Sequence, residues 1–249
     1  ATTNNNTITL ISLSDGTYEN CKIKVTDSAG NSVTRNISPF VIDTTAPTVS
    51  SISPTDNQSS VSITDNITVT FSDAMDTTYV TTNTDNTSCY GNLGVSSDNF
   101  SSCVQMASAP ASSNSNMTFT LDPYDNLTVS TTYKTRVTTG VKDAAGNTLS
   151  SQYETSSGFK TASSATAIAT GAEHSCALLD NASVKCWGLN DYGQLGIGNT
   201  TTMGDNSSEM AVLTSIDLGT GRTATAIAAG YSHTCALLDN ASVKCWGYN

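Results

Sequence analysis

Two histidines and seven cysteines are the side chains of this 249-residue chain that are best suited to chemistry. A histidine exchanges protons near neutral pH, and a cysteine thiolate is a nucleophile or a metal ligand. His174 and His233 occupy the same position in two similar segments, residues 165–190 and 224–249. Because a catalytic group is needed only once per site, a histidine present in both copies is expected to belong to the framework of each copy. We therefore predict no catalytic residue at either position.

Four of the cysteines lie in pairs within the same two segments. In each copy an apolar run is followed by a D-N-A-S turn and a short return strand, a pattern that predicts a β-hairpin. The cysteines lie symmetrically about the turn, so strand pairing would place them opposite each other. We therefore predict the disulfides Cys176–Cys186 and Cys235–Cys245. A zinc site is the weaker alternative, because C-x9-C is not a zinc spacing and no second Cys/His pair follows closely.

The other three cysteines lie upstream of the two segments. Cys89 and Cys103 flank an excursion rich in Gly, Asn and Ser, and a disulfide between them would stabilise the fold by roughly 3 kcal/mol. Cys21 is left over, which predicts an unpaired thiol or an intermolecular bond. Disulfides persist in oxidising compartments, so this cysteine content indicates an extracellular protein.

Strands are the elements expected to position these residues. The two segments are identical at 21 of 26 positions and are offset by 59 residues (235 minus 176), which indicates a repeated supersecondary unit. Only 12% of the residues are charged, and Ser, Thr and Asn dominate the remainder. No window shows the apolar stripe of an amphipathic helix. The sequence therefore predicts an all-β protein.

The C-terminal segments resemble the repeat of the regulator of chromosome condensation (RCC1) family. The resemblance rests on G-x-x-H-x-C-A-L-L from Gly171, C-W-G-x-N from Cys186 and Y-G-Q-L-G-x-G from Tyr192. It implies that each repeat forms one four-stranded blade of a propeller, and that about seven blades close the ring. With two copies in this sequence, we expect an incomplete RCC1-like β-propeller over residues 162–249.

Upstream, alternating apolar and polar residues predict the antiparallel strands of a sandwich over residues 46–161. Here F-S-D-A-M-D from Phe71 and V-K-D-A-A-G-N from Val141 are similar to paired motifs of the SbsA-type bacterial Ig-like domain. Residues 1–45 are predicted to be the C-terminal part of another Ig-like sandwich. The expected fold class is thus all-β, with tandem immunoglobulin-like β-sandwiches followed by about two RCC1-like repeats.

Three aspartates, Asp27, Asp43 and Asp143, lie at turns or at a joint between domains. The resemblance to Ig-like surface repeats implies that such carboxylates, together with backbone carbonyls, hold Ca²⁺. The alternative, which we favour, is that each carboxylate caps its own turn through an Asx hydrogen bond. We expect no cofactor other than this possible calcium ion.

The formal net charge of −11 argues against a nucleic acid or an anionic membrane as a partner, because both require clustered Lys and Arg. We therefore do not carry over the chromatin binding and nucleotide exchange of the nuclear RCC1 proteins. The chain contains no apolar run of 18 residues and no signal peptide, and it begins at Ala1. We expect a mature product or an excised segment that neither inserts into a membrane nor directs its own export.

The expected function is that of an extracellular structural or adhesive protein, in which Ig-like spacers present RCC1-like repeats on a bacterial surface or in a fibre. We expect no enzymatic activity. The alternative is a soluble recognition or inhibitor module that binds a protein or cell-surface ligand through propeller loops, with Tyr192, Tyr231, Tyr248 and Arg222 as candidate contacts. Incomplete domains would also expose strand edges through which copies could self-associate into filaments.

Overall fold

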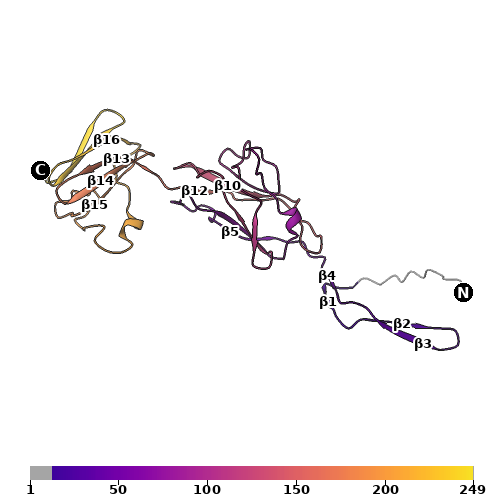
Figure 1. Ribbon diagram of the computed structural model, residues 1–249. Coiled ribbons are helices and arrows are strands. Elements are labelled where there is room, and N and C mark those ends of the chain that lie inside the picture. The colour runs from indigo at the N-terminus through magenta and orange to yellow at the C-terminus, as the bar shows by residue number, and fades with distance from the viewer. Residues whose placement is uncertain (1–12, 249) are drawn as a thin grey trace. The chain divides into compact units, whose positions relative to one another are not determined.

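The computed structural model describes residues 13–248, and they form strands and two short 3-10 helices (Figure 1). The 3-10 helices are η1 (Thr77–Tyr79) and η2 (Glu209–Val212). The predicted all-β class is therefore confirmed. No helix in residues 13–248 is long and apolar enough to cross a membrane. Two compact units are present, and the second comprises residues 59–63, 128–131 and the chain from residue 160 onward.

The N-terminal part of the first unit contains two pairs of antiparallel strands. Strand β1 (Gly16–Tyr18) pairs with β4 (Phe40–Ile42), and β2 (Lys22–Thr26) pairs with β3 (Ser32–Asn36). No side chain between residues 13 and 45 is buried. The assignment of residues 1–45 to an Ig-like sandwich stays a prediction, and its first twelve residues lie outside those described.

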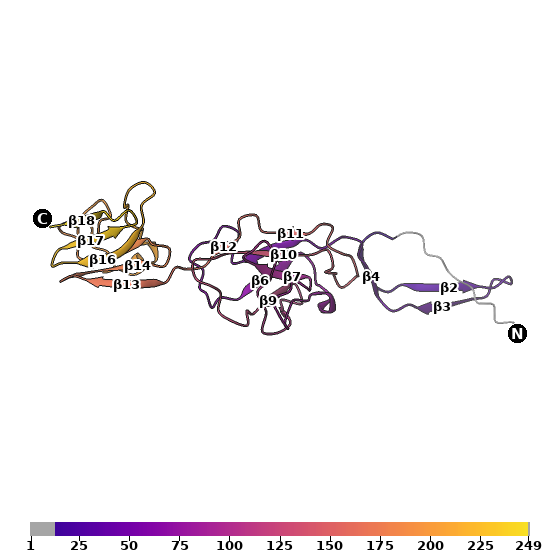
Figure 2. The same ribbon diagram turned by 90° about the horizontal axis from the view of Figure 1, so that it is seen from above.

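The rest of the first unit contains two four-stranded sheets (Figure 2). One sheet has the order β5-β6-β9-β8; in the other, β10 pairs with β7, β11 and β12. The strands are β5 (Val49–Ser53), β6 (Ile67–Phe71), β7 (Leu93–Ser96), β8 (Ala111–Ser113), β9 (Thr118–Leu121), β10 (Thr132–Val137), β11 (Tyr153–Glu154) and β12 (Phe159–Lys160). Strict alternation buries one face of β6, so that Ile67, Val69 and Phe71 form part of the core.

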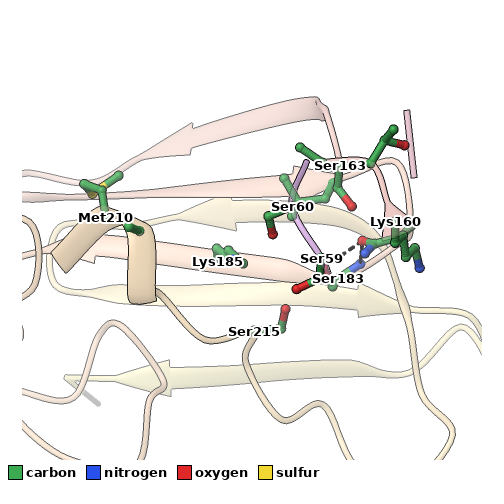
Figure 3. A pocket seen from close by; sticks show the side chains of 13 residues that line it. Ser59, Ser60, Lys160, Ser163, Ser183, Lys185, Met210 and Ser215 are labelled. Carbon is green, nitrogen blue, oxygen red and sulfur yellow. Dashed lines mark hydrogen bonds between the residues drawn. The ribbon is translucent and has the colours of Figure 1, made fainter. Parts of the chain in front are cut away.

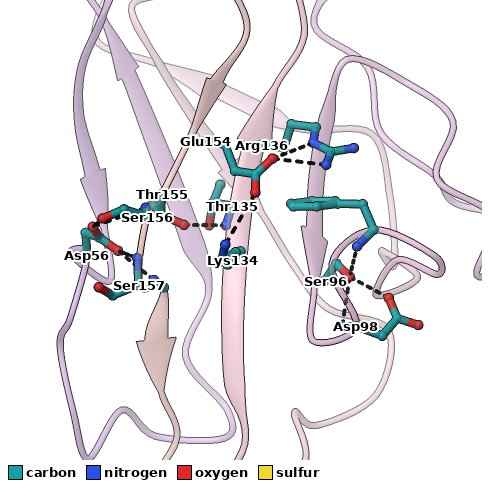
Figure 4. Close-up of polar contacts among 12 residues, drawn as sticks. Asp56, Ser96, Asp98, Lys134, Thr135, Arg136, Glu154, Thr155, Ser156 and Ser157 are labelled. Carbon is teal, nitrogen blue, oxygen red and sulfur yellow. Dashed lines mark hydrogen bonds and ion pairs between the residues drawn. The ribbon is translucent and has the colours of Figure 1, made fainter.

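Two surface loops of this unit are held by aspartate side chains (Figure 4). The Asp56 carboxylate accepts hydrogen bonds from the Ser156 hydroxyl at 2.6 Å and from the Ser157 backbone N–H at 3.0 Å. The Ser102 hydroxyl and backbone N–H, followed by the Ser96 hydroxyl, lower the pKa of Asp98 to about 2. Both carboxylates therefore stabilise turns and stay ionised at neutral pH.

The second unit consists chiefly of two three-stranded antiparallel sheets of matching register. The first contains β13 (Ala165–Thr170), β14 (His174–Leu179) and β15 (Val184–Gly188); the second contains β16 (Ala224–Ala229), β17 (His233–Leu238) and β18 (Val243–Gly247). The resemblance implies four strands per repeat, but the described residues form three. Between β15 and β16 the chain forms turns, the short helix η2 and an isolated bridge from Gly188 to Met203, but no further strand.

Candidate functional site

The structure contains three disulfides, and they join the pairs that the sequence predicts. Strand register places Cys176 opposite Cys186, and Cys235 opposite Cys245, with Cα atoms 4.0 Å apart in both pairs. The Cα atoms of Cys89 and Cys103 are 5.0 Å apart. Cys21 is a free thiol in this structure.

The two repeat disulfides differ in their surroundings. Cys176 and Cys186 are both 0% exposed and lie in the core of the second unit beside Leu178, Val184 and Leu195. In the second repeat, Cys235 is half-buried and Cys245 is exposed. The same covalent bond is thus part of the core in one repeat and lies at the surface in the other.

A buried hydrogen-bond chain joins the two repeats. The Thr234 hydroxyl donates to the Gln194 carbonyl at 3.0 Å, and the Nε2 atom of His174 lies 2.8 Å from the same hydroxyl. Because the hydroxyl proton is directed to Gln194, Nε2 must be the nitrogen that carries the ring proton. Nδ1 of His174 is buried and has no hydrogen-bond partner among the described residues. His174 is therefore a neutral part of the framework, placed by both repeats.

Trp246 makes a second contact between the repeats. Its indole N–H donates to the Gln194 carbonyl at 3.0 Å, so this carbonyl accepts from both Trp246 and Thr234. The ring packs against Gly196, where a Cβ atom would lie only 2.6 Å from Nε1. Gly196 has a φ of +70°, which favours glycine. The G-Q-L-G motif is visible in the sequence, but nothing there indicates that its second glycine packs against a tryptophan of the next repeat.

The stability of the second unit should fall as the pH falls below about 6.5. Burial, followed by the charge of His233, lowers the pKa of His174 from its ordinary value of 6.5. Between the unfolded and folded pKa values the unfolded chain binds more protons, so acid favours unfolding. The melting temperature of the wild-type chain should decrease from pH 7.5 to pH 5. This decrease should be smaller in the His174→Gln variant. An equal decrease in that variant would contradict this role.

A pocket of about 450 Å³ lies in the second unit (Figure 3). Lys160 and Lys185 line it together with five serines, and no carboxylate or aromatic side chain does. Neither lysine forms an ion pair with a described residue. Ammonium and hydroxyl groups suit an anion, but nothing in the lining selects a particular one.

The candidate calcium ligands lie in loops that satisfy their own carboxylates. Asp143 accepts backbone N–H groups from Ala145 and Asn147 at 2.9 and 2.8 Å, and the Asn147 amide at 2.9 Å. Asp27 accepts three equivalent hydrogen bonds, from the backbone N–H groups of Ala29 and Asn31 and from the Asn31 side-chain amide. The Asn31 side-chain amide is the largest cause of a lowered pKa at Asp27. Converging N–H donors stabilise a carboxylate without a metal ion.

Asp43 is brought to the Asp143 loop, where its backbone carbonyl accepts the Asn147 amide at 3.0 Å. Its own carboxylate accepts the Thr45 backbone N–H at 3.0 Å. Residues 13–248 contain no group of three or more His, Cys, Asp or Glu side chains that could hold a metal ion. Calcium at these aspartates stays a prediction.

The two Ig-like motifs meet in space. Met75 forms a β-bridge with Asp143, and the Asp76 backbone N–H donates to the Lys142 carbonyl at 2.9 Å. The two motifs are therefore in direct contact next to the Asp143 loop. The resemblance pairs the two motifs, but their contact depends on the tertiary fold.

Comparison with known proteins matches two families to consecutive parts of the chain. The bacterial Ig-like domain matches residues 43–161. The regulator of chromosome condensation (RCC1) repeat matches residues 165–194 and 224–249.

Three solved structures show weak similarity. "Surface layer protein SbsC, domains 1-6" is 20% identical with a TM-score of 0.35, over 50% of this chain and 15% of that one. The N-terminal part of the bacterial S-layer protein SbsC is 15% identical with a TM-score of 0.35, over 82% and 44%. A chain of the structure described as "Kap60 bound to yeast RCC1 (Prp20)" is 15% identical with a TM-score of 0.28, over 84% and 46%. This chain thus matches only about 15% of the length of the first of these structures.

Proposed function

Because this chain carries a bacterial Ig-like domain followed by RCC1 repeats, we propose that it is an extracellular structural protein of a bacterial surface. In this proposal the Ig-like domain is a spacer and the repeats are the part presented to other molecules. The observation that carries it is the set of three disulfides, one of them buried in the core of the repeats. Such bonds persist outside the cytoplasm.

We also propose that the chain has no reactive centre of its own. His174 is committed to the contact between the repeats, as its bond to Thr234 indicates. The net charge of −11 supports a partner other than nucleic acid or an anionic membrane. The proposed partner is a protein or another ligand at a cell surface.

The experiment is to label intact cells of the source bacterium with a membrane-impermeant amine reagent and then to map the cysteines under non-reducing conditions. The expected result is labelled protein with Cys176, Cys186, Cys235 and Cys245 all oxidised. Protein that becomes labelled only after cell lysis, with these four thiols free, would overturn the proposal. A cytoplasmic protein is the control for cell integrity.

A recognition module is the second candidate, favoured by one observation. The side chains of Tyr192, Tyr231 and Tyr248 are 54%, 81% and 63% exposed. Tyrosine is one of the residue types enriched among the interface residues that contribute most to binding. Arg222, in contrast, pairs with Asp239 at 3.5 Å. The tyrosines therefore remain candidates for binding, and the arginine is engaged within the unit.

A further inference from the structure

We propose that Tyr192, Tyr231 and Tyr248 form a surface that binds the lysine or arginine side chains of a partner protein. We call these three residues the tyrosine surface. Binding of such side chains goes beyond the proposed structural function, because it names the chemistry of a ligand. Binding can be measured in solution wherever the protein resides.

The topology brings the three tyrosines to one end of the two sheets. Tyr231 lies in the turn between β16 and β17, and Tyr248 directly follows β18. The Tyr248 backbone N–H donates to the Ser232 carbonyl at 2.9 Å, which places Tyr248 beside that turn. Tyr192 follows β15 from the other sheet, and its ring lies 4.9 Å from that of Tyr248, edge to face at 68°.

Hydrogen bonds within the second unit hold the loops that carry these rings. The Tyr192 backbone N–H donates to Gln194 Oε1 at 2.9 Å, and the Gln194 side chain is buried. The Tyr231 carbonyl accepts the Ala172 backbone N–H at 3.1 Å, which joins the turns of the two repeats. A loop whose backbone is hydrogen-bonded in this way has less conformational entropy to lose when a ligand binds.

The charged residues near the tyrosine surface indicate which kind of ligand it can bind. The exposed residues Glu173 and Asp191 lie in the loops at the tyrosine end. The four Lys and Arg residues of the second unit lie near the opposite end of the sheets. Lys185 and Lys244 are at the start of β15 and β18, Arg222 precedes β16, and Lys160 lines the same pocket as Lys185. Tyrosine faces attract a cation placed within about 6 Å, and neighbouring carboxylates add to this attraction. The tyrosine surface therefore suits a basic segment.

The experiment measures binding of the whole chain to a fluorescent Lys/Gly peptide at near-physiological salt. Matched probes are the same peptide with acetylated lysines, with trimethylated lysines and with glutamates. We expect the lysine and trimethyl-lysine peptides to bind, and the acetylated and glutamate peptides to bind at least tenfold more weakly. Retained binding of the acetylated peptide would overturn the proposal, because the cation would then be unnecessary.

Variants locate the site. Tyr192→Ala with Tyr248→Ala should weaken binding of the lysine peptide at least tenfold, whereas Tyr192→Phe with Tyr248→Phe should retain it. Lys185→Ala with Lys244→Ala, at the other end, should not weaken it. Equal binding by the alanine and wild-type chains would overturn the proposal, as would a neutral oligosaccharide that binds at these tyrosines when the lysine peptide does not. Either result would leave the proposed surface location intact.

Discussion

Replacing Cys176 and Cys186 by alanine should lower the melting temperature of the second unit more than the same change at Cys235 and Cys245. Both disulfides span a sequence separation of 10 residues, so their effects on the entropy of the unfolded chain are equal. The difference between the variants then reports the folded state. Only the Cys176–Cys186 pair lies wholly in the core, where its removal leaves a cavity.

Loss of either disulfide should cost about 2–5 kcal/mol, with the buried pair at the upper end of this range. In a unit of this size, each kcal/mol shifts the melting temperature by about 4–8 °C. Calorimetry of the two double variants, each checked for correct pairing of the remaining cysteines, measures the difference. Equal shifts would show that burial of Cys176–Cys186 contributes nothing beyond chain closure.

The local features of the repeats could be predicted from the sequence, because they depend on residues close together along the chain. The D-N-A-S turns fix the hairpin register, and the register places Cys176 opposite Cys186. Alternation along Ile67–Phe71 likewise predicts a strand with one buried face. Short-range patterns of this kind need no knowledge of the tertiary fold.

The contacts between the repeats could not be predicted from the sequence, because their partners are far apart along the chain. His174 and Thr234 are separated by 60 residues, and Gln194 and Trp246 by 52. The repeated histidine indicated a structural role, but His174 is buried whereas His233 is exposed. That asymmetry arises because His174 reaches Thr234 of the other repeat.

Residue type alone makes the tyrosines candidates for binding, and the structure adds their arrangement at one end of the two sheets. Tyr192 and Tyr248 meet edge to face only because β15 and β18 end on the same side of the two sheets. The basic residues lie near the other end for the same topological reason: each strand's two termini lie at opposite ends of its sheet. Sequence position alone shows neither relationship.

Gly196→Ala should destabilise the second unit by more than Gly198→Ala, because only the first substitution disturbs the contact between the repeats. Both glycines have positive φ, +70° and +79°, so both variants incur a similar backbone strain of about 1–3 kcal/mol. A Cβ atom at Gly196 would lie 2.6 Å from Trp246 Nε1, whereas one at Gly198 would meet nothing within 4 Å. The comparison therefore isolates the cost of displacing Trp246.

That displacement should reach the buried hydrogen-bond chain, because the Gln194 carbonyl accepts from both Trp246 and Thr234. In a Trp187→Phe background, where Trp246 is the remaining tryptophan, Gly196→Ala should shift its fluorescence to longer wavelength and lower the melting temperature. Gly198→Ala should lower the melting temperature less and leave the emission unchanged. If both variants gave the same emission and the same melting temperature, the packing of Trp246 on Gly196 would not hold the repeats together.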